Sequence, residues 1–189
     1  MDPHTLVFLD ESGAKTDMTR LRGRSPRGER VYDHTPAGHW GTTTMISSIR
    51  LDGSTACMTV DGATDTDVFA AYVAFVLRPT LKPGDLVVLD NLSPHKGTAA
   101  LRLIEQTGAT ICFLPPYSPD LNPIEGMWSK VKTFLRTEKA RTEEALGVAI
   151  ARALAQITAS DARNWFASCG YSFIQYALGD STACNNEKW

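Results

Sequence analysis

The chain has 189 residues, of which 43% are hydrophobic and 21% charged, and its formal net charge is −2. This length indicates one domain, or one domain with an appendage, and the composition is typical of a folded globular chain rather than a disordered one. The longest apolar run, residues 68–77, is too short to span a bilayer.

Five apolar runs without helical period indicate strands, at residues 5–10, 40–51, 54–60, 86–90 and 109–114. Helical spacing and capping residues indicate helices at about 64–77, 98–106, 122–136 and 143–157, with one or two short helices within 160–178. Asp52-Gly53 predicts a tight turn between the second and third strands. Three antiparallel strands followed by alternating helices and strands predict an α/β fold, a mixed five-stranded sheet flanked by helices, in the order of the ribonuclease-H-like fold.

Two of the predicted strands end in an aspartate, and a glutamate opens a later helix. The strands are Leu6-Val-Phe-Leu-Asp10 and Leu86-Val-Val-Leu-Asp90, and the glutamate is Glu125. Like charges about 4 Å apart repel by about 4 kcal/mol at an effective dielectric near 20, so such a cluster needs protons or a cation. Oxygen ligands select Mg²⁺ or Mn²⁺, which indicates metal-assisted phosphoryl chemistry.

Each of these carboxylates has a simpler interpretation when it is taken alone. Asp10 and Asp90 are then ordinary strand-end aspartates. Asn122 is expected to cap the helix, Pro123 to occupy its first position, and Glu125, at the third, to close a capping box. The combination of all three on the predicted fold favours a functional site.

Basic residues gather in two segments, although the whole chain is slightly acidic. Residues 15–30 hold six basic and two acidic side chains, and residues 130–141 hold five basic and one acidic. Segments of this kind suit a protein that grips phosphates, while solvated surface is the alternative. The side chains expected to contact such phosphates are Arg20, Arg22, Arg24, Arg27, Lys96, Lys132 and Arg136.

Three motifs of the chain resemble those of mariner-like DDE transposases, in particular their bacterial insertion-sequence branch. The motifs are Leu9-Asp-Glu-Ser12, Asp90-Asn-Leu-Ser-Pro-His-Lys96 and Leu114-Pro-Pro-Tyr-Ser-Pro-Asp-Leu-Asn-Pro-Ile-Glu125. The second aspartate and the glutamate are separated by 34 residues, a spacing that this family uses. The resemblance covers roughly residues 5–178, and the third motif is highly specific.

The resemblance implies a function and a set of roles. Asp10, Asp90 and Glu125 would be the catalytic, metal-binding triad for two Mg²⁺ ions, with Mn²⁺ as a substitute. The activity would be DNA strand cleavage and strand transfer in cut-and-paste transposition, in which ions held by the triad activate a water and stabilise the leaving oxygen. Residues 1–178 would form the catalytic domain, 11–36 a basic clamp-like loop that reaches a second subunit on DNA, and 179–189 a polar tail.

Partners and location follow from the same resemblance. Transposon-end and target DNA would be bound by a homodimer, and no membrane would be involved. The helix-turn-helix modules that usually precede this domain in the family are not expected in this sequence, so they would be separate or missing. We expect a bacterial cytoplasmic, nucleoid-associated protein, and the position of Cys57 and Cys112 inside apolar runs, as small core residues, agrees with a reducing compartment.

Several alternatives and minor candidates stay open. A catalytically silent truncated transposase that acts as a DNA-binding or regulatory partner is the main alternative function. A receiver- or phosphatase-like protein is less favoured, because neither strand-end aspartate opens a D-x-D motif and Glu125 would have no role. Glu11 is expected on the face opposite Asp10. His95 is expected to make a loop hydrogen bond rather than to contact the scissile phosphate.

Overall fold

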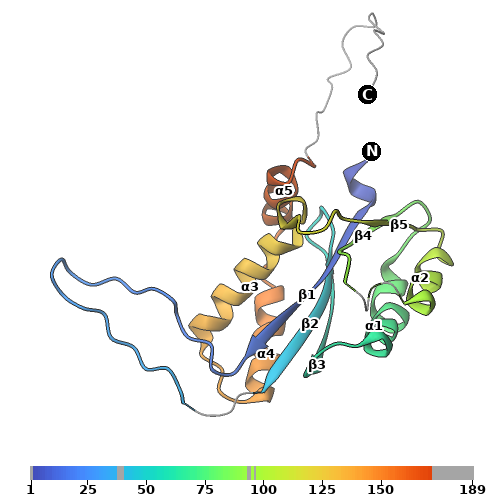
Figure 1. The fold of residues 1–189 in the computed structure, drawn as a ribbon. Coiled ribbons are helices and arrows are strands. Elements are labelled where there is room, and N and C mark those ends of the chain that lie inside the picture. The colour runs from blue at the N-terminus through green and yellow to red at the C-terminus, as the bar shows by residue number, and fades with distance from the viewer. Residues whose placement is uncertain (1, 38–40, 93–94, 96, 172–189) are drawn as a thin grey trace, which may run out of the picture.

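One five-stranded mixed sheet forms the centre of the computed structural model, which describes residues 2–37, 41–92, 95 and 97–171. The strand order is β3-β2-β1-β4-β5. The strands are β1 (Leu6–Lys15), β2 (Thr42–Ile49), β3 (Thr55–Asp61), β4 (Leu86–Leu89) and β5 (Thr110–Phe113). β1, β2 and β3 pair antiparallel, and β4 and β5 extend the sheet parallel to β1 (Figure 1). The expected architecture is therefore confirmed.

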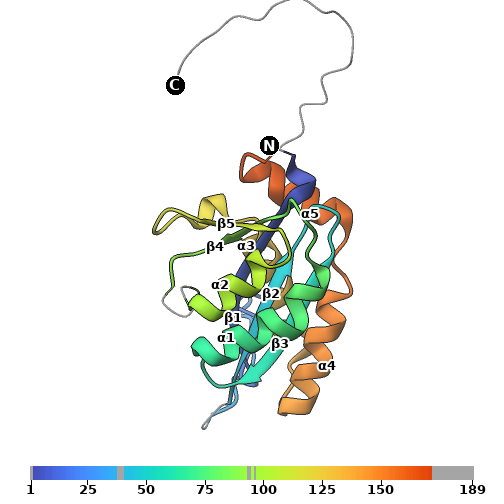
Figure 2. The ribbon, with the colours of Figure 1, turned by 90° about the vertical axis from the view of Figure 1, so that its right-hand side faces the viewer.

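Helices cover both faces of this sheet (Figures 1 and 2). The helices are α1 (Thr66–Tyr72), α2 (Thr98–Glu105), α3 (Ile124–Glu138), α4 (Glu143–Leu154) and α5 (Ala159–Ser168). α1 and α2 contribute to one hydrophobic core, and α3, α4 and α5 to the other. None of the described helices is long and apolar enough to cross a membrane.

The alternation of side chains along β1 feeds both cores. Leu6 and Phe8 are buried in the core of α3, α4 and α5, whereas Val7 and Leu9 are buried in the core of α1 and α2. Successive residues of a strand point to opposite faces, so this pattern fixes which helices each later residue of β1 meets. By this period of two, Asp10 faces α3 and Glu11 faces α1 and α2.

Some predicted boundaries were wrong. The loop expected from residue 11 begins only after Lys15, because β1 continues along β2 from Ser12, opposite Met45, to Lys15, opposite Thr42. The helix expected to reach residue 77 is α-helical only to Tyr72, and a π-helical turn, Val73–Leu77, follows it. Among the described residues, α5 is the last helix and ends at Ser168, while residues 172–178 of the expected helical segment and the predicted tail at 179–189 lie outside the part of the chain that the structure describes.

The segment between β1 and β2 projects from the body of the molecule (Figure 1). Two basic side chains just beyond the end of α3 contact this segment near its two ends. Lys139 Nζ lies 2.7 Å from Asp33 Oδ2, and the Arg141 guanidinium donates to the carbonyl oxygens of Thr16 and Met18. All residues from 20 to 35 are exposed, so this excursion contributes little to either core.

Candidate active site

Two aspartates stand at the same level of the sheet. The parallel register pairs Phe8 with Val88, and Asp10 and Asp90 lie two residues further along their strands. Both therefore continue the alternation that carries Phe8 and Val88 into the α3 core. β4 ends at Leu89, so Asp90 belongs to the loop that follows the strand, whereas Asp10 lies within β1.

The glutamate reaches the same place from α3. The predicted capping box does not form: Pro123 is the N-cap, with helical backbone angles and no side-chain cap, and Glu125 is the second helical residue rather than the third. Asn122 is extended instead, and its buried Oδ1 has no hydrogen-bond partner. Packing fixes this helix start, since Ile124 is fully buried and Gly126 lies against the Trp165 ring.

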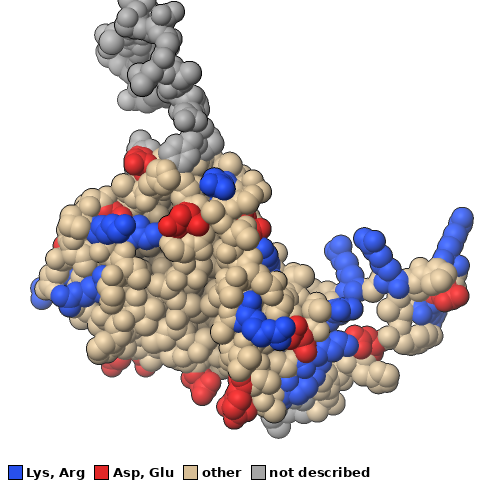
Figure 3. Space-filling model, turned by 180° about the vertical axis from the view of Figure 1, so that it is seen from behind, with Lys and Arg blue, Asp and Glu red and all other residues tan. Residues whose placement is uncertain are grey.

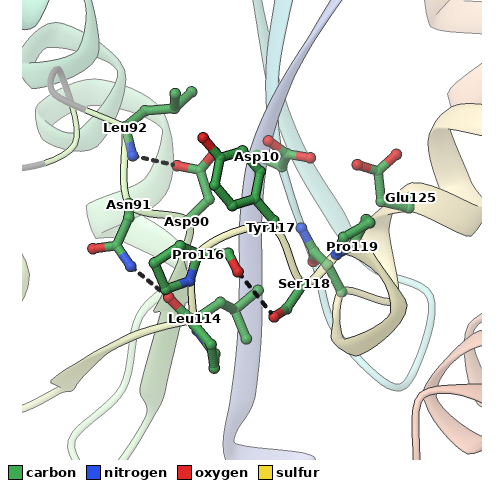
Figure 4. A pocket seen from close by; sticks show the side chains of 12 residues that line it. Asp10, Asp90, Asn91, Leu92, Leu114, Pro116, Tyr117, Ser118, Pro119 and Glu125 are labelled. Carbon is green, nitrogen blue, oxygen red and sulfur yellow. Dashed lines mark hydrogen bonds between the residues drawn. The ribbon is translucent and has the colours of Figure 1, made fainter.

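The three carboxylates line one open cavity of about 410 Å³. Asp10 lies between Asp90 and Glu125 in the close view (Figure 4). The other walls come from the loop after β4 and from the proline-rich segment between β5 and α3. The lining residues beyond the carboxylates are Asn91, Leu92, Leu114, Pro115, Pro116, Tyr117, Ser118, Pro119 and Asn122.

Asp10 has the most perturbed environment of the three carboxylates. It is only 8% exposed, and burial is the main cause that raises its pKa to about 7. A hydrogen bond from the Glu11 backbone N–H opposes this shift, whereas the charges of Glu125 and Asp90 add to it. A buried carboxyl among like charges is poised to lose its proton when a cation arrives.

His95 joins two carboxylates beside the cavity. Its side chain is fully buried, with Nδ1 2.5 Å from Asp90 Oδ1 and Nε2 3.3 Å from Glu11 Oε1. Burial lowers its pKa, but the hydrogen bonds to Asp90 and then Glu11 outweigh burial and raise the pKa to about 9. His95 therefore makes hydrogen bonds within the protein, the outcome favoured from sequence, with carboxylates as its partners.

The donor set fits divalent ions in its chemistry. Three carboxylates face one solvent-filled cavity, and hard oxygen ligands suit Mg²⁺ and Mn²⁺. Within the described residues, no three His, Cys, Asp or Glu side chains stand close enough to form a ready-made ligand set. Ionised carboxylates repel one another, so they gain nothing from closer approach until a cation neutralises them.

The residues expected to contact DNA fall into three groups. Arg20, Arg22, Arg24 and Arg27 are exposed on the projecting loop, where basic side chains stand out from the body (Figure 3). Lys132 and Arg136 lie two and three turns after Glu125 on α3 and are partly exposed. Lys96 lies outside the described residues.

A family model described as DDE superfamily endonuclease matches residues 5–147 of the chain. The chain belongs to this endonuclease family. The match contains both aspartates and the glutamate, and it ends within α4. No curated protein matches the sequence of this chain.

Solved structures share the fold of this chain at low sequence identity. The Mos1 strand transfer complex superposes with a TM-score of 0.70 at 14% identity, over 88% of this chain and 52% of the Mos1 chain. The catalytic domain of Mos1 mariner transposase gives 0.63 at 13% identity, over 88% and 77% of the two chains. The catalytic core domain of BIV integrase gives 0.51 at 15% identity, over 80% and 81%.

These likenesses establish a ribonuclease-H-like fold for the chain. The chain spans about half the length of the Mos1 chain in the strand transfer complex.

Two further residues of the cavity were not singled out from the sequence. Tyr117 is fully exposed and has a φ of 57°, a left-handed conformation that is uncommon for a bulky residue. Asn91 Nδ2 donates to the Leu114 carbonyl oxygen at 2.6 Å and so ties the two loops of the cavity together. Both residues lie in sequence motifs that were recognised, Asn91 in the one that begins at Asp90 and Tyr117 in the one that begins at Leu114, and this is the signal that could have indicated them.

Proposed function

We propose that this chain is the catalytic domain of a transposase, which cuts and joins DNA at the cavity of Asp10, Asp90 and Glu125. The observation that carries the proposal is the meeting of three carboxylates, from β1, the loop after β4 and the first turn of α3, around one open cavity. Membership of a DDE endonuclease family supports it. The Leu114–Glu125 motif favours the bacterial insertion-sequence branch and cut-and-paste transposition, which would place the protein in the cytoplasm at the nucleoid.

The three carboxylates would hold two Mg²⁺ ions, or Mn²⁺ in their place. When bound, such ions supply an activated water and stabilise the leaving oxygen in an in-line displacement at phosphorus. Asp10 would hold an ion as its carboxylate, and its pKa near 7 lets it lose the proton at physiological pH. Among solved relatives, Mos1 has been crystallised in a paired-end complex with Mn and as a catalytic domain with Mg.

DNA would approach along the basic surfaces near the cavity. Lys132 and Arg136 share α3 with Glu125, and the projecting loop carries Arg20, Arg22, Arg24 and Arg27. Mos1 transposase has been solved in a paired-end complex with a left transposon end. We infer that this chain likewise works as a homodimer on paired DNA ends, with the loop as a clamp and specific end recognition supplied by a separate region.

Nicking of supercoiled plasmid tests this function. The purified chain should convert supercoiled DNA to nicked circles with Mn²⁺ or Mg²⁺ and should do so neither in EDTA nor with Ca²⁺ alone. A catalytically silent regulatory partner would bind the same plasmid in a mobility shift without nicking it. Binding without nicking, at metal concentrations up to about 10 mM, would therefore favour that alternative.

A further inference from the structure

His95 contacts two carboxylates that the sheet holds on opposite faces. Glu11 follows Asp10 in β1 and so points towards α1 and α2, the side from which the Phe69 ring packs on the imidazole with centroids 4.5 Å apart. From there Nε2 reaches Glu11 and Nδ1 reaches Asp90. The ring is thus fixed at both nitrogens and on one face, inside a fully buried site.

Asp90 lies just beyond the end of β4, in the loop that follows the strand. The last parallel contact beside it is the hydrogen bond from Leu114 N–H to the Leu89 carbonyl oxygen. Beyond that point Asp90 Oδ1 accepts from His95 Nδ1 at 2.5 Å and from Leu92 N–H at 3.0 Å. Because the His95 ring and the Leu92 N–H both contact Asp90 Oδ1, they fix the rotation of the Asp90 carboxylate about its Cβ–Cγ bond.

We propose that His95 is the positioning residue of this site: through Nδ1 it orients Asp90 to bind the metal ion, while Glu11 holds the ring through Nε2. The inference rests on the proposed function, since it concerns Asp90 as a metal ligand. It assigns Glu11 to the support of His95, so Glu11 does not bind the ion. Outer hydrogen bonds of this kind orient metal ligands, and their loss typically costs about 10–100-fold in metal affinity or activity.

The two nitrogens can be separated by substitution. The amide nitrogen of asparagine takes roughly the place of Nδ1, and that of glutamine roughly the place of Nε2. His95→Asn therefore keeps a donor for Asp90 and loses Glu11, whereas His95→Gln keeps the contact with Glu11 and loses Asp90. If the role of His95 is to orient Asp90, His95→Asn should preserve metal binding better than His95→Gln does.

The experiment is calorimetric titration of Mn²⁺ into the full chain without DNA, for wild type, His95→Asn, His95→Gln, Glu11→Gln and Asp90→Asn. We expect His95→Gln to bind Mn²⁺ about 10–100-fold more weakly, and His95→Asn to stay within a few-fold of wild type. Glu11→Gln still offers an acceptor to Nε2–H, and should lie close to wild type. Mn²⁺-dependent nicking by the same proteins should follow the same order.

A control variant separates this role from general stability. Tyr72→Phe removes a buried hydrogen bond to the Ala56 carbonyl oxygen in the same core, away from the cavity. It should lower the melting temperature and leave the Mn²⁺ affinity unchanged. Equal Mn²⁺ affinities for wild type, His95→Asn and His95→Gln would overturn this inference and leave the proposed function standing. A loss of Mn²⁺ affinity in Glu11→Gln as large as the loss in Asp90→Asn would do the same. Failure of wild type to bind Mn²⁺ would overturn the proposed function as well.

Discussion

Gly126 packs directly under the indole ring of Trp165, so that a methyl group at residue 126 would lie 2.5 Å from Cδ1 and 2.6 Å from Cγ of Trp165. Gly126 follows Glu125 on the first turn of α3, and Trp165 belongs to α5. The contact therefore fixes how closely α5 approaches the residue that delivers the third carboxylate to the cavity.

This packing predicts that Gly126→Ala destabilises the protein. Alanine is the better helix former by about 1 kcal/mol, so a helix without tertiary contacts would gain stability. Overpacking against Trp165 should instead cost about 1–3 kcal/mol in the free energy of unfolding, measured by urea denaturation. Trp165→Ala should remove most of that penalty in a double-mutant cycle, and a Gly126→Ala protein more stable than wild type would contradict the packing argument.

Burial of Asp10 predicts a stability that depends on pH. Its folded pKa of about 7 lies above the ordinary value of 3.8, so its protonated form favours folding. This contribution is complete below about pH 4 and is lost as the pH rises through 7. Without metal, Asp10→Asn should therefore be more stable than wild type at pH 8, by up to about 4 kcal/mol, and close to it only below about pH 4.

Asp10→Asn also distinguishes a metal-binding role of Asp10 from a structural one. Mn²⁺ should raise the melting temperature of wild type at pH 8 and should raise that of Asp10→Asn much less. A wild-type stability advantage at pH 8 without metal would show that the carboxylate at residue 10 is paired rather than poised for a cation.

The projecting loop predicts a DNA-binding surface that is separable from the fold. Replacing Arg20, Arg22, Arg24 and Arg27 by alanine should leave the free energy of unfolding within about 1 kcal/mol of wild type, since all four are exposed. DNA binding should weaken and its dependence on salt should flatten, because fewer counterions are released. A fluorescence titration across a salt series measures both.

A charge-matched variant provides the control for this titration. Four other exposed basic residues, Arg78, Lys82, Arg102 and Arg163, can be replaced by alanine together. If both quadruple variants bound DNA equally well, the clamp interpretation of the loop would be wrong.

An ion pair between β2 and the turn before β4 predicts a second pH effect, away from the cavity. The Arg50 guanidinium contacts both oxygens of Asp85, at 2.5 and 3.2 Å, and also donates to the Thr80 carbonyl oxygen. Burial raises the pKa of Asp85, but the hydrogen bonds from Arg50 and the Lys82 backbone outweigh it, and the pKa lies below 3.8. The ion pair therefore stabilises the fold above that value, and its contribution is lost as the pH falls through the lowered pKa.

Asp85→Asn tests this contribution. It should lower the free energy of unfolding by about 1–3 kcal/mol at pH 7, since it leaves the partly buried Arg50 without its charge partner. The difference from wild type should shrink as the pH falls below about 4. A difference that stayed constant from pH 7 to pH 3 would attribute the loss to packing rather than to the charge.

Sequence patterns predicted the order of the elements because strand alternation and helical spacing are local signals. They did not predict that β1 runs on through Glu11-Ser-Gly-Ala-Lys15, since this stretch has few apolar residues and gains its strand structure from pairing with β2. The capping box at Asn122 failed for a similar reason. Its residues suit a cap, but burial of Ile124 and the contact of Gly126 with Trp165 set the first turn.

The candidate site was predictable in its carboxylates but not in its support. Asp10 and Asp90 end similar apolar runs, and parallel pairing brings such ends together, so their meeting around one cavity follows from the pattern. The contact of His95 with Glu11 joins residues 84 positions apart and depends on which face of β1 each side chain takes. That the carboxylates bind metal stays a prediction.

The most direct test of the account is the nicking rate of supercoiled plasmid with Mn²⁺, measured for wild type, Asp10→Asn, Asp90→Asn and Glu125→Gln. Melting curves should first show that all four proteins are folded. Each substitution removes one charge and keeps nearly the same shape, so each should abolish metal-dependent nicking. Wild-type nicking by a folded Asp90→Asn protein would contradict the claim that these three carboxylates form one nuclease site.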